Sequence, residues 1–85
     1  MINANDFGNI MNDVKIEKFN RMVKHQEKII KENMKQGYNS VLWIFSDKEQ
    51  YTTPKEKEWY QEFYNEAKIG FENQGFKING IFIKW

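Results

Sequence analysis

The chain ends in Gly75-Phe76-Lys77-Ile78-Asn79-Gly80-Ile81-Phe82-Ile83-Lys84-Trp85, where an Asn-Gly step separates two runs of alternating apolar residues. This is the strongest short-range signal for a β-hairpin, because a type I′ turn requires positive φ at both central residues. The sequence therefore predicts a C-terminal hairpin with a two-residue turn at Asn79-Gly80. That turn sets a register in which Ile78 pairs with Ile81, Lys77 with Phe82, and Phe76 with Ile83.

The same register divides the side chains of the hairpin between two faces, since side chains alternate along a strand. One face holds most of the large apolar groups and is expected to lie in the core: Phe76, Ile78, Ile81, Ile83 and Trp85. The other face carries Lys77, Phe82 and Lys84. Two amphipathic helices cover only one side of a three-stranded sheet, so we expect this second face to be open.

Upstream of the hairpin, apolar residues recur with helical spacing from about residue 14 to residue 35, and Gly37 follows as a C-cap. Residues 1–12 precede this helix as a lead-in segment or a short helical turn. The helix is expected to turn one stripe toward the core, made of Phe19, Met22, Val23, Gln26, Ile29, Ile30 and Met34.

A second helix is predicted over residues 54–73. Thr53 is a suitable N-cap, Pro54 suits the first helical position, and Glu56 completes a capping box. Gly75 is expected to end this helix, as Gly37 ends the first.

Between the helices lies the short apolar run Ser40-Val41-Leu42-Trp43-Ile44-Phe45, which is rich in residues that favour strands. We predict a strand over this whole run. Leu42 and Ile44 are expected to face the helices, which leaves Trp43 and Phe45 on the open face beside Phe82.

Together these elements predict one small α+β domain over residues 1–85. Two helices pack on one face of a three-stranded, mainly antiparallel sheet, in the order α-β-α-β-β. We expect the first strand to lie antiparallel beside the last, with pairing to the second strand as the alternative.

Composition narrows the classes of function. The chain has no cysteine and one histidine, His25, which excludes thiol nucleophiles, thiolate metal sites and histidine-rich metal sites. The isolated glycines form no phosphate-binding loop. We therefore expect a protein that is not an enzyme and has no cofactor. No apolar run approaches the roughly 20 residues of a membrane span, and a signal peptide is not apparent, so a cytoplasmic location is expected.

The open sheet face is the main candidate for function. An apolar patch of Trp43, Phe45 and Phe82, flanked by Lys77 and Lys84, is typical of a protein interface. Unpaired bases stacked on the aromatic rings are an alternative. A purely structural role, with Trp43 in the core or the N-terminal segment over the face, is the third interpretation.

A basic stripe on the first helix is the second candidate. Arg21, Lys24, Lys28, Lys31 and Lys35 lie within one side of that helix. The stripe suits phosphate backbones or an acidic protein surface, whereas the ordinary alternative is a solvated helix face. Residues 47–73 are acidic overall, with seven Asp or Glu against four Lys, so the two helices are also suited to self-association.

Three short motifs resemble small uncharacterised proteins of tailed bacteriophages: Gly37-Tyr38-Asn39-Ser40-Val41, Gly75-Phe76-Lys77-Ile78 and the terminal Ile83-Lys84-Trp85. The resemblance spans about residues 16–85 and concerns structural motifs. It implies a phage-encoded accessory protein in the host cytoplasm that binds and inhibits a host or defence protein. The alternatives are a nucleic-acid-binding protein that uses the basic stripe, and a homo-oligomeric sponge for a small molecule or a nucleotide signal.

Overall fold

The computed structural model describes the backbone of residues 4–85 and the side chains of residues 13–85. The elements follow in the order α1 (Ala4–Lys35), β1 (Ser40–Leu42), the short 3-10 helices η1 (Ile44–Ser46) and η2 (Lys48–Gln50), α2 (Pro54–Glu58), α3 (Tyr60–Asn73), β2 (Lys77–Asn79) and β3 (Phe82–Lys84). The predicted α+β class is confirmed.

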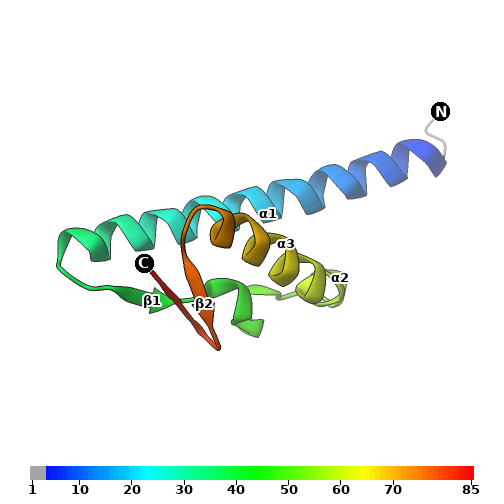
Figure 1. Ribbon diagram of the computed structural model, residues 1–85. Helices are drawn as coiled ribbons and strands as arrows, with labels where there is room; N and C mark the ends of the chain where they lie inside the picture. The colour runs from blue at the N-terminus through cyan, green and yellow to red at the C-terminus, as the bar shows by residue number, and fades with distance from the viewer. Residues whose placement is uncertain (1–3) are drawn as a thin grey trace.

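Helix α1 is much longer than the sequence pattern indicated. Its 32 residues begin at Ala4, so the prediction of a lead-in over residues 1–12 is wrong for residues 4–12, which are the first turns of the helix. At 1.5 Å per residue the helix measures about 48 Å. Figure 1 shows its N-terminal end extending beyond the rest of the molecule.

The predicted C-caps are confirmed at both long helices. After α1, the backbone N–H of Tyr38 donates to Asn33 O at 3.0 Å and that of Gly37 to Met34 O at 3.1 Å, which is the Schellman pattern. After α3, Phe76 and Gly75 donate to Phe71 O and Glu72 O in the same way.

The second predicted helix is interrupted at one residue, Trp59, between α2 and α3. The N–H of Trp59 donates to Glu56 O at 3.0 Å, an i to i−3 bond that tightens the turn locally. Thr53 is the N-cap of α2, as predicted, and its Oγ1 accepts from the N–H of Glu56 at 3.1 Å.

The prediction of a strand over residues 40–45 is wrong beyond Leu42. After Leu42 the chain leaves the sheet and enters η1, so that Trp43 and Phe45 both lie in the core with 0% exposure. Ile44 is buried, as expected, but Leu42 was expected inside and is 43% exposed. A tight turn has no two-residue alternation, and all three residues after Leu42 can therefore be buried together.

The three strands form an antiparallel sheet in the order β1-β3-β2, with β1 beside the last strand. The predicted register of β2 and β3 is wrong, because Ile78 pairs with Ile83 and Asn79 with Phe82. The two turn residues are thus Gly80 and Ile81. Gly80 has φ of 64°, and no non-glycine residue of the described chain has positive φ, which is the pattern of a type II′ turn.

The strand residues of the hairpin still lie on their predicted faces, because the pairing differs from the predicted one by two residues and side chains alternate with a period of two. Ile83 is fully buried, and Phe76, Ile78 and Trp85 pack against the core, as predicted. Only Ile81 differs: it is in the turn and 54% exposed.

The core lies between α1, α3 and the inner face of the sheet, and aromatic rings dominate it. Trp43 has ring centroids 4.9 Å from Phe45 and 5.4 Å from Phe71, while Phe19 of α1 meets Phe63 of α3 at 5.2 Å. Such edge-to-face and tilted ring pairs stabilise a core beyond the area that they bury. The rings thus hold η1 between the two long helices.

Candidate functional site

The open side of the sheet, here named the outer sheet face, is built from residues that alternate with the core positions. Paired residues of antiparallel strands share a face, and the register therefore gives two rows of three. One row is Leu42, Phe82 and Asn79, and the other is Ser40, Lys84 and Lys77.

The structure places three of the five residues predicted for this interface on the outer sheet face. Lys77 and Lys84 are exposed, and Phe82 is 48% exposed. Trp43 and Phe45 do not belong to it, since both are buried. Their place is taken by Leu42, which is the direct cross-strand partner of Phe82. With Ile81 in the adjoining turn, the face still has an apolar centre.

The basic stripe of α1 has the expected exposure. Arg21, Lys24, Lys28, Lys31 and Lys35 are all exposed. Arg21 pairs with Glu17 at 3.1 Å, both on the surface of α1. Within the described side chains, the four lysines form no ion pair with a carboxylate.

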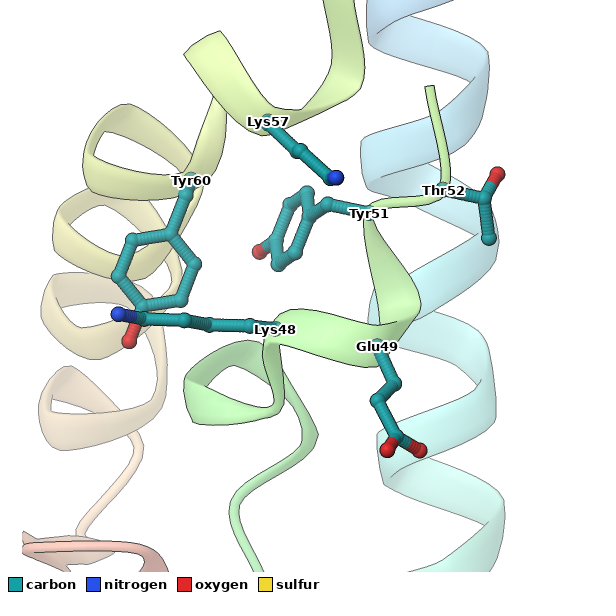
Figure 2. Close-up of a pocket in the computed structure, with 6 residues that line it drawn as sticks. All are labelled: Lys48, Glu49, Tyr51, Thr52, Lys57 and Tyr60. Carbon is teal, nitrogen blue, oxygen red and sulfur yellow. The ribbon is translucent and has the colours of Figure 1, made fainter. Parts of the chain in front are cut away.

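A pocket that the sequence did not reveal lies where η2, the following loop, α2 and α3 meet (Figure 2). Its volume is ≈ 760 Å³, and its lining residues are Lys48, Glu49, Tyr51, Thr52, Lys57 and Tyr60. These residues come from η2, α2, α3 and the loop between η2 and α2, none of which carries a recognised binding motif.

Two tyrosines form the wall of this pocket. Their rings meet edge to face with centroids 5.3 Å apart. The hydroxyl of Tyr51 donates to Phe45 O and that of Tyr60 to Ser46 O, each at 3.4 Å. Burial raises the pKa of Tyr51 far above its usual value, with a smaller contribution from Tyr60, so the phenol stays neutral and remains a donor.

Two lysines supply the charge of the pocket. Lys48 Nζ lies 5.7 Å from the centroid of the Tyr60 ring, a cation–π contact, and Figure 2 shows Lys57 extending from α2 toward the Tyr51 ring. The carboxylate of Glu49 points away from both rings (Figure 2). The groups that converge on the aromatic wall are therefore both cationic.

The loop that carries the pocket is tied to α1 by Lys18. Its Nζ lies 2.8 Å from Glu56 Oε1 and donates to Gln50 O at 2.6 Å. The hydrogen bond from Lys18 lowers the pKa of Glu56 below its usual value, and hydrogen bonds from Thr52 contribute to the shift. Nearby, Lys15 of α1 pairs with Glu62 of α3. These contacts hold the pocket side of the domain against the long helix.

Among the residues that the structure describes, no group of three or more His, Cys, Asp or Glu is placed to hold a metal ion. Over the same part of the chain, every helix is too short or too polar to cross a membrane. Comparisons of the chain with protein-family models, curated proteins and solved structures yield no match.

Proposed function

We propose that the protein is a non-enzymatic interaction protein that binds a protein partner through the outer sheet face. The observation that carries this proposal is the adjacent pair Leu42 and Phe82, which are cross-strand neighbours and 43% and 48% exposed. Ile81, 54% exposed, adjoins them in the turn. Contiguous apolar groups on the surface of a small domain usually mark an interaction site.

The charges on the same face suggest the chemistry of the partner. Lys77 and Lys84 lie directly opposite each other on β2 and β3. Like charges in that position repel, which costs the sheet stability. A carboxylate from a partner would relieve this repulsion. The proposed partner therefore presents an apolar centre with an acidic group beside it, and the resemblance to phage accessory proteins favours a host or defence protein in the host cytoplasm.

A matched pair of variants tests the proposal in affinity purification from a host lysate. Phe82→Ser removes the apolar centre, whereas Ile69→Ser changes an equally exposed apolar residue of α3 outside the sheet. Both variants should keep the circular dichroism of the folded protein. We expect a partner that is recovered with the unaltered protein and with Ile69→Ser but lost with Phe82→Ser. Equal recovery with both variants would contradict the proposal.

A second candidate function, binding of nucleic acid, is favoured by the exposure of all five residues of the basic stripe. In this case affinity falls with salt, with a log–log slope of about −0.7 to −0.9 per phosphate contacted. Replacing Lys24 and Lys28 with Gln should reduce that slope, while Phe82→Ser should leave it unchanged. No binding to single- or double-stranded DNA or RNA at low salt would eliminate this candidate.

A further inference from the structure

We propose that two copies of the chain form a twofold-symmetric dimer through the surface that α1 and α3 share, here named the helical face. In this dimer the lysines of α1 in each copy lie against the carboxylates of α3 in the other. The helical face contains no residue of the outer sheet face, so the dimer is independent of the proposed protein interface.

The helical face is formed by two long helices that lie side by side and run in the same direction (Figure 1). Phe19 of α1 meets Phe63 of α3, and both helices line a groove of ≈ 380 Å³ at this level. Farther toward both C-termini, a second groove of ≈ 330 Å³ is lined by Ile30 and Met34 of α1 and by Phe71 of α3. The two helices therefore offer one extended surface.

Each helix contributes mainly one sign of charge to the helical face. Residues 21–35 of α1 carry five Arg or Lys against two Glu, whereas α3 carries three Glu against one Lys. Lys24 borders the same surface hollow as Ile16, and Lys31 lines the second groove beside Met34. The three carboxylates of α3 are exposed and recur with helical spacing, at Glu62, Glu66 and Glu72. A basic side and an acidic side thus adjoin each other, which makes the face complementary to a second copy of itself.

Several of these charges have no partner within one copy. Among the side chains from residue 13 onward, no ion pair is formed by Lys24, Lys31, Glu66 or Glu72. Glu66 also lies one helical turn from Glu62, and like charges at that spacing repel each other. A cation from a second copy would relieve this repulsion.

A twofold axis that runs along the line between the two helices brings opposite charges together. It places α1 of each copy against α3 of the other, so that every contact occurs twice. Positions along the axis are unchanged by this rotation. Because the contact between Phe19 and Phe63 marks equal heights on the two helices, Lys24 lies at nearly the height of Glu66. Lys24 of one copy therefore meets Glu66 of the other.

About two turns farther along the helices, Lys31 and Glu72 meet in the same way. Exposed apolar side chains lie beside these charges, since Ile69 is 60%, Ile16 57% and Met34 43% exposed. Removing such side chains from water supplies the attraction, because exposed ion pairs contribute little by themselves. The charges select the orientation in which the two copies meet.

Two charge-reversal variants test the dimer by light scattering after size-exclusion chromatography, from micromolar to millimolar protein freed of nucleic acid. One combines Lys24→Glu with Lys31→Glu, and the other combines Glu66→Lys with Glu72→Lys. We expect the mass of the unaltered protein to rise to that of a dimer, whereas each variant alone stays a monomer. An equimolar mixture of the two variants should form the dimer again, because every contact then joins opposite charges. This recovery also shows that both variants are folded.

Two further variants separate the helical face from the rest of the surface. Ile69→Ser should weaken dimerisation at least about tenfold, since it removes an apolar side chain from each copy. Lys77→Glu combined with Lys84→Glu makes the same change of net charge on the outer sheet face and should dimerise like the unaltered protein. The proposal is overturned if the unaltered protein stays a monomer, if either helical-face variant dimerises alone, if their mixture stays monomeric, or if the outer-face variant also loses the dimer.

Discussion

Gln26 Oε1 accepts a hydrogen bond of 2.9 Å from the backbone N–H of Ile44. The same amide donates through Nε2 to Leu42 O at 3.1 Å, and the side chain is fully buried. Gln26 thus binds the chain on both sides of Trp43, where β1 ends and η1 begins. It satisfies backbone groups that would otherwise be left unpaired when the chain leaves the sheet.

Replacing Gln26 with Met keeps the length of the side chain but removes both hydrogen bonds. Leaving the buried N–H of Ile44 unpaired costs about 1–3 kcal/mol, so we expect a loss of at least about 1 kcal/mol in the free energy of unfolding. Urea denaturation measures it. The control is Gln61→Met, which affects an exposed amide bonded to Asn65 and should cost less than about 0.5 kcal/mol. Equal effects would show that the two bonds of Gln26 do not stabilise the fold.

The bond from Gln26 also explains why the first strand, β1, was predicted too long. The run from Val41 to Phe45 has the composition of a strand, and local propensity cannot show that a side chain 18 residues upstream binds Ile44. Gln26 itself was placed correctly in the inward stripe of α1. A glutamine among apolar residues signals a buried polar partner, but not which backbone group it will bind.

Trp43 and Phe82 were both expected on the open face of the sheet, and only Phe82 lies there. Trp43 is buried against Phe45, Phe71 and Tyr64, and within the described residues its indole N–H has no hydrogen-bond partner, so its contribution is packing. Trp43→Ala should cost about 3–5 kcal/mol, because it empties a core site. Phe82→Ala should cost less than about 1 kcal/mol. Thermal or urea unfolding measures the free energy of unfolding of both variants. Similar losses of stability would contradict the assignment of Phe82 to the surface.

The hairpin shows which part of a register the sequence determines. The Asn-Gly step located the turn to within one residue, but a type I′ turn at Asn79-Gly80 and a type II′ turn at Gly80-Ile81 both use Gly80. In the observed register Val41 and Ile78 both pair with Ile83. This pairing brings three apolar residues together on the inner face of the sheet. Because the two registers differ by two residues, Lys77, Phe82 and Lys84 were still assigned to the correct side.

Replacing two glycines with alanine should change the free energy of unfolding in opposite directions. Gly80 has φ of 64° in the turn, where a Cβ is strained, and Gly80→Ala should destabilise the protein by at least about 1 kcal/mol. Gly70 lies within α3, and a Cβ there would meet nothing within 4 Å. Gly70→Ala should therefore stabilise the protein by about 0.5–1 kcal/mol. Both are read from urea denaturation, and a change of the same sign in the two variants would contradict the turn geometry.

Sequence patterns did not predict the pocket, and the reason differs from that for the strand and the hairpin. Alternation predicted the hairpin residues Lys77, Phe82 and Lys84 of the outer sheet face, since their positions depend on neighbours within short strands. The pocket brings Lys48, Tyr51, Lys57 and Tyr60 together through the packing of η2 against α2 and α3. No helix was predicted at the first of these elements, and the break in the helix at Trp59 was not foreseen.

Lys77→Glu tests the repulsion across the hairpin. The change places a carboxylate opposite Lys84, and opposite charges in a cross-strand pair are favourable by about 0.2–1 kcal/mol. We expect the variant to be more stable than the unaltered protein at low salt, with the difference shrinking as salt is added. Lys28→Glu, at an exposed position in the interior of α1, is the control for the same change in net charge. A gain of equal size in both variants would point to net charge instead of the pair.

The junction of α1 with α2 should make stability depend on acid pH. Lys18 holds the pKa of Glu56 below its usual value in the folded protein, so the unfolded chain takes up a proton at higher pH than the folded one. The stabilisation is therefore present at neutral pH and is lost as the pH falls through the lowered pKa. We expect Glu56→Gln to be less stable than the unaltered protein at pH 7, with the difference shrinking at acid pH and vanishing once the pH has fallen through the lowered pKa of Glu56. Glu58→Gln, an exposed neighbour, is the control. A difference between Glu56→Gln and the unaltered protein that stays constant with pH would mean that the charge of Glu56 is not what Lys18 recognises.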